Sequence, residues 1–216
     1  MQDRLKELFN KCASFADSVN VSKISIIKGT DPFLQELSLI KKPEKRVEFA
    51  KKSFKLIGEG SARAAFLIPV GRVLKVAKNE KGMAQNCLEA KPEMQRDCTN
   101  RIIMADPEGK WIIVKRAKKI SEEKFEELTG FSFDDFTDAL FYKFNNESDS
   151  DKPDNYSDII KSDLFRSIAQ MMVELDNDLQ LGDLYRISSW GESEGKPVIV
   201  DYGLDRDIYQ EYYEDD

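Results

Sequence analysis

Two aspartates near the end of the chain have the type and spacing that could bind a metal ion and accept a proton. Asp183 lies in the polar segment GDLYRISSWG, and Asp201 follows the apolar run VIV. The residues between them predict a hairpin, which would bring the two carboxylates together. Such a pair can hold a divalent cation beside a hydroxyl group. The alternative is that Asp201 only begins a surface turn, because Asp and Gly often follow apolar strands.

A glycine-containing turn occurs earlier, in the segment LIGEGSARAAF. Gly58 and Gly60 stand there between two apolar runs, and Ser61 follows them. Glycine at such a turn lets backbone N–H groups approach a phosphate closely. A plain tight turn uses the same residues, so the motif alone leaves both interpretations open.

A lysine in the predicted strand RVLKVAK is a third candidate. Lys75 stands between apolar neighbours, and it would need a counter-ion if its side chain pointed inward. Glu89 on the next predicted helix could provide that counter-ion. Glu93, one turn further along the same predicted helix, is an alternative.

Hydrophobic periodicity predicts the elements that would position these residues, in an α+β order with a β-rich part before an α-rich part. In the first half we expect helices at 3–18 and around 32–40, a basic connector or short helix at 41–53, three antiparallel strands within 54–78, a helix at 81–98, and a hairpin of strands 101–105 and 110–116. In the second half we expect helices starting after Ser121 and Ser132, with Gly130 ending the first, then a polar loop at 145–155, a helix at 158–178, a hairpin before Asp201, and a frayed acidic tail.

Charge is unevenly divided along the 216 residues, whose net charge is −7. Residues 1–120 contain 25 basic and 14 acidic groups, whereas residues 121–216 contain 8 and 26. This asymmetry favours contact between the halves or faces of opposite sign, although solvated surfaces would also produce it. The basic residues form no stripe with flanking aromatics, so we expect no direct nucleic-acid binding.

The chain contains no histidine, which excludes a histidine-based nucleophile relay and most zinc sites. Any metal would be held by oxygen ligands, which favours Mg²⁺ or Mn²⁺. Three cysteines in unlike contexts suit a reducing, cytoplasmic compartment. No apolar run is long enough for a transmembrane helix and the N-terminus is not typical of a signal peptide, so we expect no membrane association.

The ordered set of a glycine-rich turn, a strand Lys, a helix Glu, a loop Asp and a strand-end Asp-Tyr-Gly resembles the protein-kinase-like fold over residues 54–207. The strings VLKVAKNEKGMAQNCLE, GDLYRISSWG and VIVDYGL also look like kinase-like proteins encoded by bacteriophages. The resemblance implies a bilobal α+β protein. Its parts would be a helical N-terminal extension at 1–53, a β-rich N-lobe with the hinge at 54–119, and a truncated helical C-lobe at 120–216.

The same resemblance implies ATP and Mg²⁺ as cofactors and assigns roles to single residues. Lys75 would orient the nucleotide phosphates and Glu89 would hold Lys75. Asp201 would bind the metal, and Asp183 would accept the proton of the attacking hydroxyl. Gly58, Gly60 and Ser61 would contact the phosphates through their backbone.

Four departures from the family pattern bear on catalysis. Arg63 replaces the third glycine of the loop, and Leu181 stands where a histidine is expected. Ser188 occupies the position of a metal-binding Asn, so we expect Ser188, or its neighbour Ser189, to be a weak second Mg²⁺ ligand. Only 13 residues follow Gly203, which leaves no room for an activation segment or for the later helices that usually recognise peptide substrates.

Three functions therefore remain open. The chain could transfer the γ-phosphate of Mg-ATP to a hydroxyl acceptor, in the host cytoplasm if it is phage-encoded. It could instead be a pseudokinase that acts as a virion component or a host-interaction module, with a protein partner bound by the N-terminal helices. It could also be an unrelated α+β domain whose motifs match by chance, in which case Lys75, Asp183 and Asp201 would not converge.

Overall fold

The computed structural model describes residues 31–145, 152–176 and 178–213. The helix expected at 3–18 lies outside these residues. Contacts within the chain divide it into two compact units. The first unit combines the chain up to Gln95 with Arg101–Arg116 and the residues from Ile208 onward. The second combines Arg96–Asn100 with Ala117–Asp207.

The first unit is built on a five-stranded antiparallel sheet of order β1-β2-β3-β5-β4. One helix, α4, is inserted between β3 and β4, so the expected series of five strands with one inserted helix is confirmed. The elements are β1 (Lys55–Glu59), β2 (Arg63–Ile68), β3 (Arg72–Ala77), α4 (Glu80–Glu89), β4 (Ile102–Ala105) and β5 (Trp111–Lys115).

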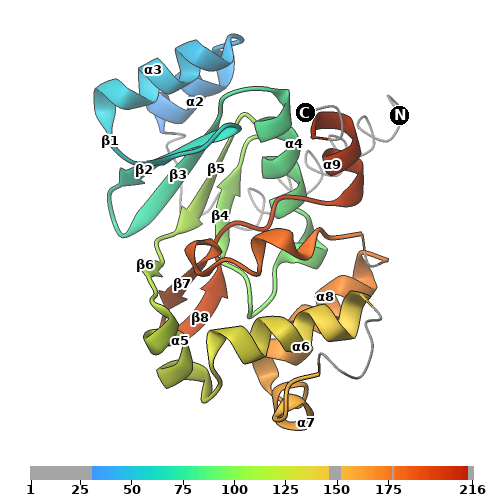
Figure 1. Cartoon of the computed structure of the whole chain (residues 1–216). Helices are drawn as coiled ribbons and strands as arrows, with labels where there is room; N and C mark the ends of the chain where they lie inside the picture. Colours follow the sequence, from blue (N-terminus) through green and yellow to red (C-terminus); the bar gives the residue numbers. More distant parts are fainter. Residues whose placement is uncertain (1–30, 146–151, 177, 214–216) are drawn as a thin grey trace. The chain divides into compact units, whose positions relative to one another are not determined.

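Two N-terminal helices cover one face of this sheet, as Figure 1 shows. They are α2 (Pro32–Leu39) and α3 (Pro43–Ser53). The basic segment forms a helix because Pro43 suits the first helical turn. The buried core on this face comprises Leu34, Leu37, Val47, Ala50, Ala64, Phe66, Leu74, Val76, Trp111 and Ile113.

This core includes side chains from both α2 and α3. Leu37 and Ala50 are fully buried against the sheet. The described part of the extension is therefore a layer of the first unit. Burial of these apolar side chains holds α2 and α3 against the sheet.

Helix α4 is shorter than expected. It ends at Glu89, not at residue 98, because Lys91 has the extended backbone (ψ 141°) that a following proline favours. Pro92 then begins a 3₁₀ turn, Pro92–Met94. Glu93 consequently does not lie one helical turn after Glu89 on the same helix.

The second unit combines helices with a small antiparallel sheet of order β6-β7-β8. An edge-to-face group of aromatic rings forms its core: Phe125, Phe133, Phe136, Phe165 and Trp190. Its elements are β6 (Lys118–Lys119), α5 (Glu122–Thr129), α6 (Phe133–Asn145), α7 (Tyr156–Ile159), α8 (Asp163–Glu174), β7 (Trp190–Ser193) and β8 (Lys196–Ile199).

Most helix ends in this unit follow the expected signals. Ser121 caps α5, Gly130 ends it at a φ of 79°, and Ser132 accepts a hydrogen bond from the amide of Asp135. The helix expected at 158–178 is instead two, α7 and α8. The hydroxyl of Ser162 accepts from the amide of Phe165 and so starts the second helix.

The acidic C-terminal segment corrects another expectation. It does not fray at Gln210 but forms α9 (Arg206–Tyr212), with Ile208 fully buried. In Figure 1 this helix lies beside α4. The contact is specific: Gln85 donates to the hydroxyl of Tyr213, and the ammonium of Lys81 lies 3.6 Å from the centre of the Tyr213 ring.

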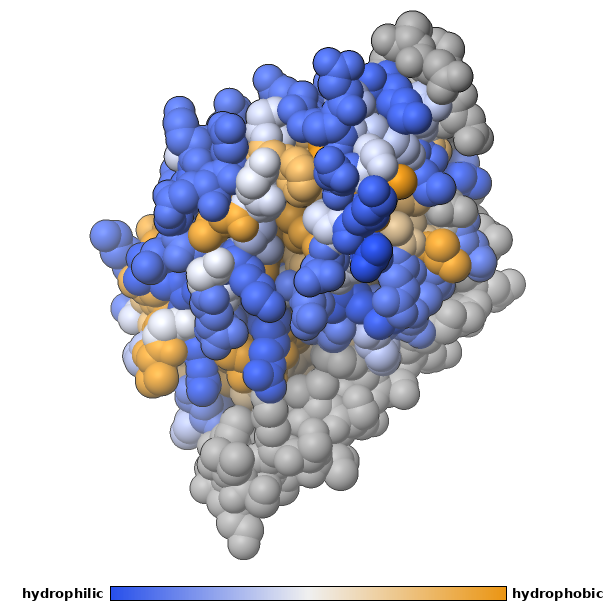
Figure 2. All heavy atoms as spheres, turned by 90° about the horizontal axis from the view of Figure 1, so that it is seen from below, coloured by the Kyte–Doolittle hydropathy of each residue, from blue (hydrophilic) through white to orange (hydrophobic). Residues whose placement is uncertain are grey.

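None of the helices in the described part of the chain combines the length and apolar character needed to cross a membrane. On the face drawn in Figure 2, hydrophilic side chains predominate and the hydrophobic ones lie between them in separate groups.

Candidate functional site

Lys75 and Glu89 form a buried ion pair, as the sequence predicts. The ammonium of Lys75 lies 2.7 Å from Oε2 of Glu89. Strand β3 is central, paired with both β2 and β5, and Lys75 stands opposite Ala65 and Ile112. Its side chain is 12% exposed and that of Glu89 is 0% exposed. The structure thus selects Glu89 as the counter-ion for the strand lysine.

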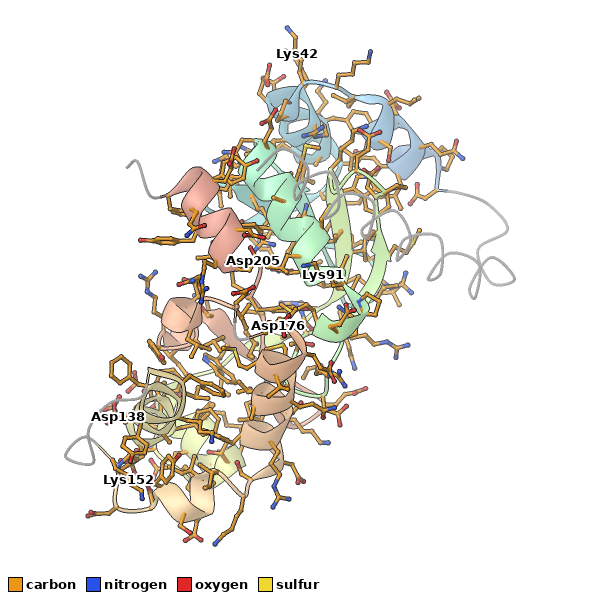
Figure 3. All side chains as sticks on the ribbon, turned by 90° about the vertical axis from the view of Figure 1, so that its right-hand side faces the viewer. Lys42, Lys91, Asp138, Lys152, Asp176 and Asp205 are labelled. Atoms are coloured by element: carbon orange, nitrogen blue, oxygen red, sulfur yellow. The ribbon has the colours of Figure 1, made fainter. Side chains whose placement is uncertain are left out.

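Helix α4 brings Glu89 to this position. It covers the sheet face opposite α2 and α3, because Lys75 alternates along β3 with the core residues Leu74 and Val76. Glu89 is the last helical residue, two positions before Lys91, which Figure 3 labels at that end of α4.

Arg63 is a partner of Glu89 that the sequence reasoning missed. Its Nη1 lies 2.6 Å from Oε1 of Glu89, and its side chain is 10% exposed. Both carboxylate oxygens of Glu89 therefore contact a cation. Strand pairing explains the contact. Lys75 stands opposite Ala65, and Arg63 is two residues before Ala65 on the same strand. The side chains of Arg63 and Lys75 therefore lie on the same face of the sheet.

The turn after β1 is tied to the start of α4. The ammonium of Lys78 donates to the carbonyl of Gly60 at 2.8 Å, and the side-chain amide of Asn79 donates to the carbonyl of Ser61 at 3.2 Å. The amide of Lys78 donates to the carbonyl of Ala62. Hydrogen bonds to three successive carbonyls, those of Gly60, Ser61 and Ala62, therefore hold this turn in place.

The fold itself does not require glycine at either predicted phosphate-binding position. Gly58 lies within β1, at a register irregularity and opposite Ala65, so it is not at the turn itself as expected. A Cβ there would lie 3.9 Å from the Cβ of Ala65, and one on Gly60 would lie 3.9 Å from the carbonyl oxygen of Arg63. Neither glycine has a positive φ. Both are exposed, and so is Ser61.

Gly82, by contrast, is required by packing. A Cβ on this α4 residue would lie 2.1 Å from the carbonyl oxygen of Ala62. Such a distance is impossible without a shift of the backbone. The missing side chain lets α4 lie directly against the turn that follows β1.

The two predicted catalytic aspartates lie in the second unit, on either side of the β7–β8 hairpin in sequence. Asp183 ends a 3₁₀ turn, Leu181–Asp183, and its carboxylate lies 3.7 Å from the guanidinium of Arg186. Asp201 is exposed and follows β8 by two residues. The predicted hairpin between them is confirmed.

The residues around the aspartates differ in their exposure. Ser188 lies in a second 3₁₀ turn, Ile187–Ser189, and is exposed. Tyr202 is buried, and its hydroxyl donates to the carbonyl of Asn100 at 3.3 Å. The buried Tyr202 fixes the backbone next to Asp201, which is itself exposed.

Oxygen ligands for a hard cation are thus present in Asp201 and Ser188. Over the described residues, no group of three or more His, Cys, Asp or Glu side chains is arranged to hold a metal. Mg²⁺ commonly uses only one or two carboxylates together with phosphate oxygens and water. One carboxylate and one hydroxyl are compatible with Mg²⁺ bound together with phosphate and water. They are too few for a site in which the protein supplies every ligand.

Comparison of the chain with models of protein families, with curated proteins and with solved structures gave no match.

Proposed function

We propose that the protein binds Mg-ATP and transfers its γ-phosphate to a hydroxyl acceptor, in the manner of the protein-kinase-like fold. The observation that carries the proposal is the buried ion pair of Lys75 and Glu89. It joins the central strand of an antiparallel sheet to the one helix inserted among its strands. In kinase-like proteins a pair of this kind orients the nucleotide phosphates.

The energetics of the pair favour a functional role over a stabilising one. Moving a carboxylate and an ammonium out of water costs several kcal/mol per ion, and their attraction repays this cost only with excellent geometry. Apolar side chains at positions 75 and 89 could fill the same buried space without this cost. A lysine kept on a strand between Leu74 and Val76 is therefore better explained by a ligand that needs its charge.

The glycines support the same proposal. The fold has room for a side chain at Gly58 and at Gly60. Glycine at these two positions is therefore best explained by a ligand that closely approaches the backbone. Phosphate oxygens are suitable ligands, because they accept hydrogen bonds from backbone N–H groups.

The remaining roles follow from residue chemistry. Asp201 would hold Mg²⁺, with Ser188 as a weaker neutral ligand, and bound Mg²⁺ would neutralise charge on the phosphates. Asp183 would accept the proton of the attacking hydroxyl. Lys75 would orient the phosphates while Glu89 fixes Lys75. In this reaction class positioning and charge stabilisation supply most of the rate.

The two units of the chain would be the two lobes of such a protein, joined near Arg116 and Ala117. A bacteriophage-encoded protein that acts in the host cytoplasm would fit the resemblance in the sequence. The acceptor is proposed only as a class, namely a Ser, Thr or Tyr hydroxyl or a small alcohol.

A second candidate is a pseudokinase that binds the nucleotide without transferring phosphate. Ser188 favours it, because a neutral hydroxyl replaces the amide of the family's second metal ligand. Such a protein would act as an interaction module in a virion or in the host, with a protein as its partner.

Thermal shift with ATP, in the presence and absence of Mg²⁺, tests the nucleotide site. We expect ATP to raise the melting temperature of the unchanged protein only when Mg²⁺ is present. Lys75→Met should abolish this shift because the phosphates lose their cation, and Asp201→Asn should abolish it because the metal loses its carboxylate. Lys55→Met and Asp154→Asn are matched controls, since both residues are exposed and lie outside the site.

A phosphate-transfer assay with a mixture of peptide and small-alcohol acceptors then separates the two candidates. Transfer that Asp183→Asn reduces by orders of magnitude supports the enzyme. Binding without transfer supports the pseudokinase. Absence of any shift at millimolar Mg-ATP would disprove both.

A further inference from the structure

We propose that Asn79 is a positioning residue of the nucleotide site, which fixes the turn between β1 and β2 so that its backbone N–H groups are oriented for the phosphates of the ligand. This inference rests on the proposed function. Lys78, the preceding residue, acts on the same turn. The resemblance to kinase-like proteins assigns no role to either residue.

The side chain of Asn79 makes two hydrogen bonds that serve different purposes. Its Oδ1 accepts from the amide of Gly82 at 2.9 Å and so caps α4. Its Nδ2 donates to the carbonyl of Ser61 at 3.2 Å. Capping requires only an oxygen acceptor, which serine or aspartate would supply equally well. The amide donor is therefore the part of Asn79 that acts on the turn.

Lys78 binds the carbonyls on either side of Ser61. Its ammonium donates to the carbonyl of Gly60 at 2.8 Å, and its backbone amide donates to the carbonyl of Ala62 at 2.8 Å. The ammonium also contacts Oε1 of Glu59 at 2.8 Å, but this ion pair stabilises little, because its side chains are 29% and 34% exposed. Its main effect is thus on the carbonyls of the turn.

These hydrogen bonds set the direction of the N–H groups in the turn. A peptide group is planar and trans, so the carbonyl of one residue and the N–H of the next point in opposite directions. The carbonyls of Gly60 and Ser61 are bound by Lys78 and Asn79, so the N–H groups that follow them point away from these donors. N–H groups with a fixed direction are suited to phosphate oxygens, which accept hydrogen bonds.

The side-chain hydrogen bonds should affect ligand affinity more than stability. Gly60 and Ser61 are exposed, so water would bind their carbonyls if the side-chain donors were removed. A turn that is already fixed in the free protein loses less conformational freedom when the ligand binds. Loss of the donors should therefore weaken the binding of phosphates while the protein stays folded.

Calorimetric titration of the full chain with ATP and with adenosine, each with Mg²⁺, tests this inference. Asn79→Ser keeps the helix cap and the net charge but loses the amide donor to the turn. We expect its dissociation constant for ATP to rise about three- to tenfold, and that for adenosine to change less than about twofold. Adenosine is the control ligand because it has no phosphate.

Lys78 gives an independent test of the same turn. Lys78→Met should weaken ATP binding at least as much as Asn79→Ser does. Lys78→Arg keeps the charge and a donor, so it should restore most of the affinity. Lys55→Met, at the exposed start of β1, is the matched control for the loss of one surface charge.

Each variant is first checked by circular dichroism at the titration temperature. If Asn79→Ser does not fold, Asn79→Thr also keeps a capping oxygen and the net charge. Equal ATP affinity in the folded variant and the unchanged protein would overturn the inference alone. Equal losses for ATP and adenosine would also overturn it, since they indicate a general structural role. No ATP binding by the unchanged protein would overturn the proposed function and this inference together.

Discussion

At the scale of single residues, the glycines of the first unit fall into two kinds. Gly82 is needed by the protein, because the carbonyl of Ala62 occupies the space of a side chain. Gly58 is not needed, because its surroundings and its backbone accept alanine. This difference separates a glycine kept for packing from one proposed to serve a ligand.

We expect Gly82→Ala to lower the free energy of unfolding by about 2 kcal/mol or more, because the new Cβ forces α4 away from the turn. Gly58→Ala should leave stability unchanged or raise it by up to about 1 kcal/mol, because alanine restricts the unfolded chain. Urea unfolding of both variants measures the two effects. If Gly58→Ala also weakens ATP binding while remaining stable, the proposed role of this glycine is supported; unchanged ATP affinity would contradict that role.

Cys98 predicts a dependence of stability on alkaline pH. Burial raises the pKa of its thiol to about 11 from an ordinary value of 9.0. Below pH 9 the thiol is protonated in both the folded and the unfolded state, so it has no effect on stability there. Between pH 9 and 11 the unfolded state loses the proton first, and stability should fall by up to about 3 kcal/mol.

The measurement is urea unfolding at several pH values from 8 to 11, for the unchanged protein and for Cys98→Ala. Other groups also titrate in this range, so the difference between the two curves is the informative quantity. Cys98→Ala should be less stable than the unchanged protein at pH 8 and should lose less stability as the pH rises. Parallel curves would contradict the prediction.

At the scale of elements, α2 is anchored to the β4–β5 hairpin through one serine. The hydroxyl of Ser38 donates to Oδ2 of Asp106 at 2.7 Å and accepts from the indole N–H of Trp111 at 2.8 Å. Its carbonyl accepts from the ammonium of Lys110. Asp106 and Trp111 are both buried, so the serine satisfies polar groups that water does not reach.

Ser38→Ala should therefore lower the free energy of unfolding by about 1–3 kcal/mol, because it leaves the buried indole N–H without this acceptor. Ser53→Ala is the matched control, since Ser53 ends α3 and is exposed. Unfolding in urea followed by fluorescence compares the two. Equal stability of the two variants would show that Ser38 does not anchor α2.

At the scale of the whole molecule, the C-terminal segment 208–213 belongs to the first unit. Tyr213 accepts a hydrogen bond from Gln85 and covers the ammonium of Lys81, one turn away on α4. A helix that carries Glu89 at one end is thus supported near its other end by the C-terminal segment. The contact spans 128 residues of sequence.

We expect Tyr213→Ala to reduce the protection of α4 backbone amides from hydrogen exchange, by a free energy of about 1 kcal/mol. Tyr213→Phe keeps the ring over Lys81 and loses only the hydrogen bond, so its effect should be intermediate. Exchange measured by mass spectrometry on peptides from α4 gives both values. Unchanged protection in Tyr213→Ala would mean that the segment does not support the helix.

The sequence by itself determined the α+β order, the sheet strands of the first unit and most helix starts. These depend on local patterns, namely apolar alternation along strands and capping residues such as Ser121. It also predicted that an inward-pointing Lys75 needs a counter-ion, with Glu89 or Glu93 as the candidates, and the resemblance to kinase-like proteins favoured Glu89.

Only the tertiary structure decided the features that depend on contacts between distant segments. It chose Glu89 over Glu93, revealed Arg63 as the second cation, and required Gly82 against the carbonyl of Ala62. It also packed α2 and α3 against the sheet and formed α9 from Arg206–Tyr212. Burial and close packing are properties of several segments at once, so no local pattern encodes them.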